Sequence, residues 1–157
     1  MDCQIREWKI EDAVDLAVAL NNKKIQDNLR DGLPYPYTEK DAKDYITAML
    51  QADKNVTYAF AITTPDKVIG SIGVFRKDNI HARTAEMGYY IAEPFWGNGF
   101  GTSAVQKTCK YIFAHTDIIR IFAEPFAYNT ASCRILEKSG FFCEGILRNN
   151  AIKNGIH

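Results

Sequence analysis

The feature that most constrains this sequence is a glycine-rich turn between a predicted strand and a predicted helix. Gly97, Gly99 and Gly101 lie within five residues, after a strand that ends near Ile91 and before a helix that runs to His115. Glycine lets a backbone approach an anion with no Cβ in the way, and the first turn of a helix presents unpaired N–H groups and the positive end of its dipole. The segment therefore predicts a cradle for a pyrophosphate.

The spacing of the glycines narrows the choice of ligand. The phosphate-loop pattern GxxxxGK[ST] fails because no lysine follows the glycines, which argues against ATP. The residues from Gly99 to Ala104 fit the dinucleotide pattern GxGxxA, with Glu124 as a ribose ligand at the end of the next predicted strand. However, the residues from Glu93 to Trp96 separate the strand from the glycines, and too little chain follows to complete a dinucleotide-binding sheet. A tight turn without a ligand explains one glycine but not three.

Three segments resemble those of one family. The segment from Trp96 to Gly101 resembles the acetyl-CoA loop of the GNAT N-acetyltransferases, with tryptophan in place of the usual glutamine or arginine. The segment from Asn129 to Phe141 is similar to the NxxSxxxxEKxGF helix of the branch that contains the ribosomal-protein N-terminal acetyltransferases. Pro34 to Thr38 resembles the proline-tyrosine segment that these proteins carry between their first two helices. This resemblance implies a GNAT fold and acetyl-CoA as the co-substrate.

The resemblance also implies which residues contact acetyl-CoA. Pantetheine would lie between the strand that ends at Glu124 and a splayed strand edge formed by Tyr89, Tyr90 and Ile91. Pro125 fits this splay because proline cannot donate to a strand ladder. Asn129 would cap the helix that follows or bind the pantetheine amide. The pyrophosphate would lie over the loop and the first helical turn, at Trp96, Gly97, Asn98, Gly99, Phe100, Gly101 and Thr102.

Acetyl transfer to an amine requires a base, stabilisation of the tetrahedral oxygen, and a proton for the departing thiolate. Glu124 is the first candidate for the base and Glu86 is the second, since their positions match carboxylates that different GNAT enzymes use. Many of these enzymes use a tyrosine of the motif helix as the acid, but the matching position here is Leu136, so Ser132 is the candidate acid. Each residue also has a purely structural interpretation: a solvated or hydrogen-bonded carboxylate, or a helix-capping hydroxyl.

Composition limits the class of protein. The 157 residues are 46% hydrophobic and 24% charged, which is typical of one globular domain spanning residues 1–157. The 19 basic residues balance the 19 acidic ones, so we expect neither nucleic acid nor membrane as a partner. No leader-like segment or long apolar run is present, which predicts a cytoplasmic protein. The cysteines, Cys3, Cys109, Cys133 and Cys143, lack metal-ligand spacing, so we expect reduced thiols and no metal.

Hydrophobic periodicity and turn residues predict an α/β (α+β) fold. The expected strands are Ile5–Trp8, Tyr58–Thr63, Lys67–Arg76, Thr84–Ala92, Ile118–Glu124 and Phe142–Arg148, and the second and third should form a hairpin through the turn residues 64–66. The expected helices are Glu11–Asn22, one capped by Thr38, Gly101–His115 and Thr130–Ser139. The strands that flank the glycine loop should run parallel, because a strand-helix-strand crossover is right-handed. We therefore expect a mixed, mostly antiparallel twisted sheet with helices on both faces. Family members continue past Asn154 into a last strand, which we expect to be missing here.

These patterns predict an acetyl-CoA-dependent N-acetyltransferase that transfers the acetyl group directly, with no covalent enzyme intermediate. The acceptor would be a primary amine, either a protein N-terminal amine or a small molecule, and the protein would be a monomer or a homodimer. The irregular loop from Asn28 to Tyr37 and the segment from Arg148 to Lys153 would roof the acceptor side, since loops on a rigid scaffold carry specificity. Two alternatives are a non-catalytic CoA-binding module of the same fold and a dinucleotide-binding oxidoreductase.

Overall fold

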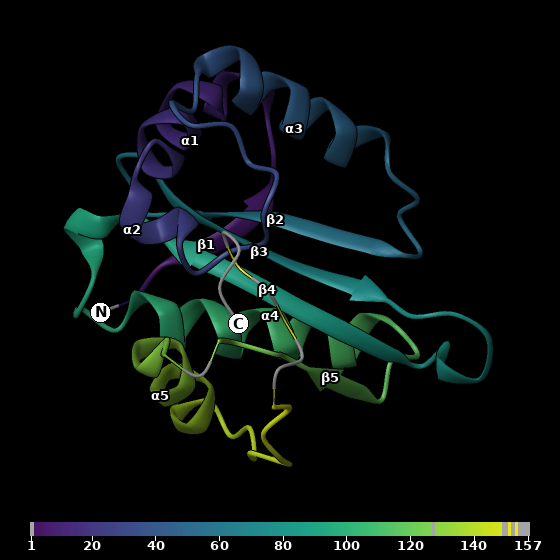
Figure 1. The fold of residues 1–157 in the computed structure, drawn as a ribbon. Coiled ribbons are helices and arrows are strands. Elements are labelled where there is room, and N and C mark those ends of the chain that lie inside the picture. The colour runs from purple at the N-terminus through teal and green to yellow at the C-terminus, as the bar shows by residue number, and fades with distance from the viewer. Residues whose placement is uncertain (1, 127, 149–150, 152, 154–157) are drawn as a thin grey trace.

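A five-stranded sheet lies between two layers of helices in the computed structural model, which describes residues 2–126, 128–148, 151 and 153 (Figure 1). The strands are β1 (Gln4–Glu7), β2 (Thr57–Thr63), β3 (Val68–Arg76), β4 (Thr84–Ile91) and β5 (Arg120–Phe122), in that spatial order. The helices are α1 (Ala13–Leu20), α2 (Lys23–Gln26), α3 (Glu39–Gln51), α4 (Phe100–His115) and α5 (Thr130–Lys138), with short 3-10 turns at Ile10–Asp12, Asn79–His81 and Glu93–Phe95. None of the helices in these residues is long and apolar enough to cross a membrane.

The sheet is mixed, as the sequence predicts. Strands β1 to β4 pair antiparallel in sequential order, and β2 and β3 form the predicted hairpin. Strand β5 instead pairs parallel to β4, after the crossover through α4. The parallel pairing joins Thr84–Glu86 to Arg120–Phe122 and extends no further.

Each face of the sheet packs against its own helices. Figure 1 shows α1 and α3 on one side and α4 with α5 on the other. Because side chains alternate along a strand, β4 contributes to both cores. Its residues Ala85, Met87 and Ile91 are buried against α4, in a cluster that also contains Val105. Tyr90 packs on the opposite side, against the cluster formed with α1 and α3.

Two helix starts illustrate what local sequence encodes. The predicted cap of α3 is confirmed: the Thr38 hydroxyl accepts from the Asp41 N–H, and the Asp41 carboxylate accepts from the Thr38 N–H. Helix α2 was not predicted from the sequence. Its four residues are too few to show a helical period, and the cue is the Asn22 side chain, which accepts from two backbone N–H groups of the first turn.

Two predicted strands differ in the structure. Strand β5 ends at Phe122 rather than Glu124, because the chain turns away from β4 before Pro125. The predicted strand Phe142–Arg148 is wrong: its residues are irregular, and the Phe142 and Ile146 side chains are 91% and 76% exposed. Apolar residues form a strand only beside a partner, and no described segment pairs with the outer edge of β5. The expected absence of a last strand concerns residues 154–157, outside the described residues.

The close approach of β3 and β4 depends on Gly70. A Cβ at this position would lie 2.3 Å from the Tyr90 carbonyl oxygen and 3.2 Å from the Ile91 Cα. Both atoms belong to the backbone and cannot rotate away. A Cβ added to Gly88, on the neighbouring strand, would have no such atom within 4 Å.

We expect Gly70→Ala to lower the free energy of unfolding by about 1–3 kcal/mol, because β4 must shift to make room. Urea denaturation followed by circular dichroism measures the loss. Gly88→Ala is the matched control and should stay within about 0.5 kcal/mol of the wild-type protein. Equal stabilities for the two variants would contradict the steric argument.

Candidate functional site

The site begins where β4 loses its partner. Strand β4 continues from Glu86 to Ile91, whereas β5 pairs with it only as far as Glu86. If the pairing continued, Glu124 would lie opposite Gly88. The predicted splay between these two strands is therefore present in the structure.

Backbone N–H groups of β4 face this gap. The Ala92 N–H donates to the Ile69 carbonyl, and the Thr84 carbonyl accepts from Lys77, so the even-numbered residues of β4 bond to β3. In an antiparallel ladder the residues between bonded pairs point the other way. The N–H groups of Tyr89 and Ile91 thus point away from β3, on the side where β5 has ended. Fixed donors of this kind can stabilise a developing oxyanion.

The glycine loop has the backbone conformation that its sequence predicts. Gly97 and Gly99 adopt φ values of 77° and 80°, which glycine reaches without strain. Gly99 is the N-cap of α4, and as a glycine it has no side chain with which to cap the helix. Hydrogen bonds from side chains shape the loop itself: the Trp96 indole N–H donates to the Ile91 carbonyl at 2.6 Å, and the Asn98 amide donates to the Phe95 carbonyl at 3.3 Å. Trp96 therefore ties the loop to the end of β4.

Two other loop residues have packing roles. A Cβ on Gly101 would lie 2.7 Å from the Ile135 Cδ1, so this glycine allows α4 to pack closely against α5. The Phe100 ring is 8% exposed and packs against Phe95, with ring centroids 6.0 Å apart. Only their backbone N–H groups are thus left to face a ligand, at the start of α4.

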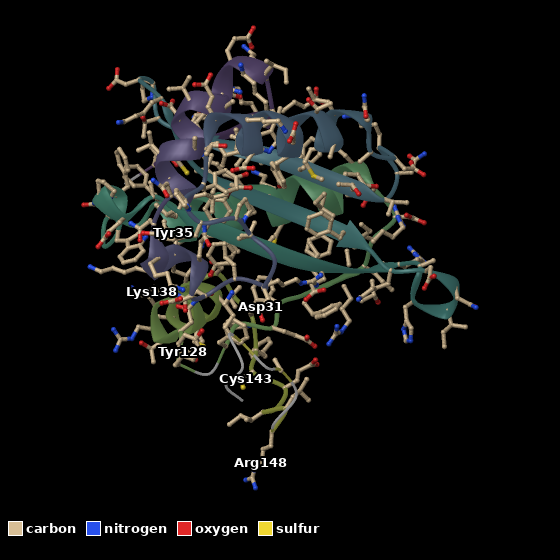
Figure 2. The ribbon with its side chains drawn as sticks, turned by 45° about the horizontal axis from the view of Figure 1, so that its top comes forward. Asp31, Tyr35, Tyr128, Lys138, Cys143 and Arg148 are labelled. Atoms are coloured by element: carbon tan, nitrogen blue, oxygen red, sulfur yellow. The ribbon has the colours of Figure 1, made fainter. Side chains whose placement is uncertain are left out.

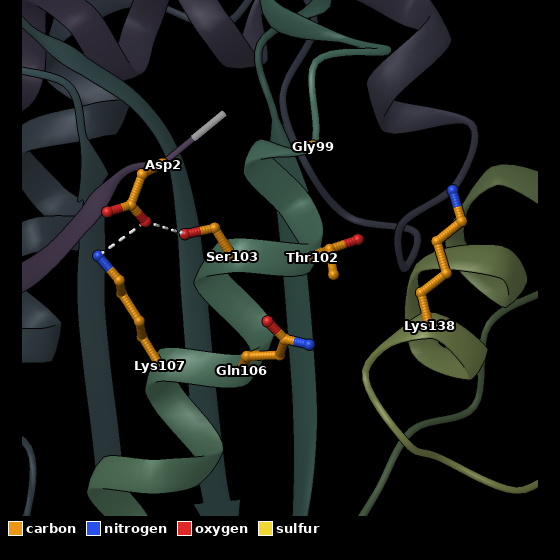
Figure 3. Close-up of a pocket in the computed structure, with 7 residues that line it drawn as sticks. All are labelled: Asp2, Gly99, Thr102, Ser103, Gln106, Lys107 and Lys138. Carbon is orange, nitrogen blue, oxygen red and sulfur yellow. Dashed lines mark hydrogen bonds and ion pairs between the residues drawn. The ribbon is translucent and has the colours of Figure 1, made fainter.

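A hollow of about 430 Å³ opens beside the N-terminus of α4 (Figure 3). Gly99 and Thr102 line it at the helix start, and Lys138 faces it from α5. Lys107 also lines it, but its ammonium group is paired with the Asp2 carboxylate at 2.9 Å. Hydrogen bonds from Ser103 and Lys107 lower the pKa of Asp2. Lys138 makes no ion pair with the described residues, which leaves its charge available to an anion.

Asn129 and Ser132 lie at the start of α5, and Ser132 contacts β4. The Asn129 side chain accepts from the Ser132 N–H at 3.2 Å, so its predicted capping role is confirmed. The Ser132 hydroxyl lies 2.7 Å from the Tyr89 hydroxyl, across the gap between α5 and β4. Sequence reasoning assigned only the Tyr89 backbone to the site. The alternation of β4 could have placed its side chain on the α4 and α5 side, together with Met87 and Ile91.

The two candidate carboxylates differ in their surroundings. Glu86 is on β4, and its carboxylate lies 3.6 Å from Arg30 and 3.9 Å from Lys77. Glu124 follows β5, is exposed, and makes no ion pair or hydrogen bond with the described residues. The structure does not bring the two carboxylates into contact. Their possible catalytic roles stay predictions.

The loop between α2 and α3 lies next to the chain that follows β5. The Tyr128 hydroxyl donates to the Asp27 carbonyl, and Lys153 lies 3.1 Å from the Asp31 carboxylate. Figure 2 labels Asp31 and Tyr128 on this side of the molecule. The two segments that were expected to roof the acceptor side are therefore joined by Lys153, although part of the second, at residues 149, 150 and 152, lies outside the described residues.

Comparison with known proteins identifies the family. The family described as "Acetyltransferase (GNAT) domain" matches residues 3–142. The chain belongs to the GNAT acetyltransferase family. The match covers β1 to α5, and so includes the open edge of β4, the glycine loop and both candidate carboxylates.

Individual GNAT relatives show how far the likeness extends. The uncharacterized N-acetyltransferase YoaA of Bacillus subtilis (strain 168) is 35% identical over 108 residues, which are 69% of this chain and 60% of YoaA. This chain thus spans less than two thirds of that relative. The ribosomal-protein-S5-alanine acetyltransferase of Vibrio fischeri has a TM-score of 0.87 at 22% identity, over 99% of this chain and 88% of the other. RimL, a ribosomal L7/L12 alpha-N-protein acetyltransferase solved with coenzyme A, has a TM-score of 0.87 at 19% identity, over 100% of this chain and 89% of RimL. These two structures confirm the GNAT fold.

The partly buried Tyr89 hydroxyl gives a test at high pH. Burial raises its pKa to about 12, from an ordinary value near 10. The unfolded chain releases this proton at lower pH than the folded protein does, so the corresponding stability is complete below about pH 10 and is lost as the pH rises through about 12. We expect the free energy of unfolding to fall over this range, and to fall less steeply in Tyr89→Phe. Urea unfolding at several pH values measures both slopes, and equal slopes would contradict the burial of this hydroxyl.

Proposed function

We propose that this protein is an acetyl-CoA-dependent N-acetyltransferase that transfers the acetyl group directly to a primary amine. The observation that carries the proposal is the open edge of β4, which loses β5 at Glu86 and leads toward the N-terminus of α4, where the N-cap residue is a glycine. A thioester beside this edge would meet fixed N–H donors while its diphosphate meets a helix start. Membership of the GNAT family, in which RimL was solved with coenzyme A, supports this ligand and disfavours the dinucleotide alternative.

Charge and hydrogen-bonding capacity support an arrangement for acetyl-CoA. The diphosphate would bind the N–H groups of the loop and the first turn of α4, between Gly97 and Thr102. Lys138 is the cation that we assign to a phosphate of the ligand, because Lys107 is engaged by Asp2. Pantetheine would then run along the open edge of β4 and bring the thioester to Tyr89.

The surroundings of the carboxylates favour Glu124 as the base. Glu124 is exposed and makes no ion pair with the described residues, so an incoming amine meets no competing partner. Glu86 has two cations within 4.0 Å, and one of them, Arg30, belongs to the loop before α3. We therefore assign Glu86 a role in holding this loop. Ser132 is the donor that we assign to the sulfur, as its hydroxyl lies at the start of α5 beside β4.

The acceptor is a primary amine in this proposal, on a protein N-terminus or on a small molecule. The acceptor wall in this proposal is formed by the loop between α2 and α3 together with Glu86 and Lys153, and it contains both signs of charge: Arg30 lies beside Glu86, and Lys153 lies beside Asp31. Such a wall does not select a polycation. The names of RimL and the S5-alanine acetyltransferase, whose folds this chain shares, make peptides with free N-termini the first acceptors to try.

Ligand binding tests the proposed diphosphate site. Acetyl-CoA at about 100 times its Kd should stabilise the protein by about 2.7 kcal/mol and raise the Tm by about 5–10 °C, whereas NADH should not. We expect Gly99→Ala to weaken binding of acetyl-CoA at least about tenfold, since a Cβ is strained at φ 80° and enters the cradle. Gly140→Ala, at φ 97° after α5, introduces the same kind of strain and should keep wild-type affinity. Equal loss in both variants would place the diphosphate elsewhere.

Turnover tests the proposed base. We expect Glu124→Gln to lower kcat about 100-fold or more while acetyl-CoA binding is retained, because the amine is no longer deprotonated in place. Glu86→Gln should instead raise the KM for the acceptor through the loosened loop. The measurement is CoA release from acetyl-CoA with peptides and small primary amines as acceptors. Unchanged turnover in Glu124→Gln would remove Glu124 from the mechanism, and a wild-type protein that binds acetyl-CoA without turnover would indicate a non-catalytic CoA-binding module.

A further inference from the structure

We infer that Tyr89 is a positioning residue that orients the Ser132 hydroxyl toward the thioester sulfur. The inference rests on the proposed function and assigns its proton donor more fully. It concerns the Tyr89 side chain, whereas the family resemblance gave a role only to the backbone of this residue.

The geometry begins with two hydroxyl groups from different elements. The Tyr89 and Ser132 hydroxyl oxygens are 2.7 Å apart, a normal distance for an O–H···O hydrogen bond. The Tyr89 hydroxyl also lies 3.3 Å from the Ser132 carbonyl oxygen, which is a long contact for such a donor. The shorter bond is therefore the better use of the single phenolic proton.

The direction of this bond decides what Ser132 can do. When Tyr89 donates to the Ser132 oxygen, the serine proton is left to point at another acceptor. Burial raises the pKa of Tyr89 to about 12, so the phenol keeps its proton at neutral pH and is able to donate it. Asn129 holds the Ser132 N–H at 3.2 Å and thereby fixes the backbone that carries this hydroxyl. In the direction that we infer, one donor chain runs from Tyr89 through Ser132 toward the open edge of β4.

Leu136, at the position where many GNAT enzymes carry a tyrosine acid, cannot act as a proton donor. Leu136 lies one turn after Ser132 on α5, is 6% exposed, and belongs to the buried hydrophobic residues. It carries no proton donor. The phenol at this site comes instead from Tyr89 on β4, which faces the start of α5.

The chemical step balances without a further reagent. The amine nitrogen attacks the carbonyl carbon to form the C–N bond, the C–S bond then breaks, and its electron pair goes to sulfur. The Ser132 hydroxyl donates a hydrogen bond to this thiolate, strengthened by the bond that Ser132 accepts from Tyr89. The proton that finally neutralises the sulfur is the one that the amine nitrogen loses, carried by the base and solvent.

A double-mutant cycle tests the inference. We expect Tyr89→Phe to lower kcat about tenfold with little change in the KM for acetyl-CoA, and Ser132→Ala to lower it further. The kcat of the double variant should equal the kcat of Ser132→Ala, because both changes act through one hydrogen bond. Tyr58→Phe is the matched control: it removes a phenol that bonds to Asn55 and Arg76 rather than to Ser132, and should keep wild-type kcat.

Thioesters with different leaving thiols distinguish a positioning role of Tyr89 from a purely structural one. A thioester whose thiol is more acidic than that of CoA needs less help from a donor, so the loss in Tyr89→Phe should shrink with it. Wild-type kcat in Tyr89→Phe would overturn the inference while the transferase proposal stands. So would a loss of kcat in Tyr89→Phe that is equal for both thioesters and that recurs in full when the same change is made in Ser132→Ala. A wild-type protein that transfers no acetyl group would overturn both.

Discussion

The site depends on the early end of parallel pairing between β4 and β5. Three residues of β5 pair with β4, and the ladder stops at Glu86. Beyond that point β4 keeps its shape because β3 holds its other edge as far as Ile91. The result is a rigid strand with N–H groups that have lost their strand partner on one side, an arrangement that is costly in a protein core and useful beside a ligand. Pro125, which has no N–H to donate, follows soon after the last paired residue of β5.

The glycines show how one sequence motif serves two physical needs. Gly97 and Gly99 take positive φ values and shape the turn before α4. Gly101, two residues later, is helical, and its missing side chain makes room for Ile135 of α5. This close packing keeps α5 beside α4, and the hydrogen bond between Tyr89 and Ser132 then links α5 to β4. The turn that we propose for the diphosphate and the placement of the proposed sulfur donor are therefore encoded within the same few residues.

The sequence predicted most elements but not all the contacts between them. The helix cap at Thr38, the β2–β3 hairpin and the parallel crossover follow from local patterns and handedness, and all three are present. The strand predicted over Phe142–Arg148 failed because strand formation depends on a neighbour, which a local pattern does not reveal. The contact of Tyr89 with Ser132 joins residues 43 positions apart, and no spacing rule within one element could have found it.

The two carboxylates show why position in a motif is not enough to assign chemistry. Glu86 and Glu124 both flank the gap in the sequence-based picture, but the structure gives them different electrostatic surroundings. Glu86 lies within 4.0 Å of both Arg30 and Lys77, and two cationic partners restrict where its carboxylate can move. Exposed Glu124 can exchange water for an amine at little cost. The proposed mechanism therefore assigns anchoring of the acceptor loop and proton transfer to separate residues, since Glu86 already has two cationic partners and Glu124 makes no ion pair with the described residues.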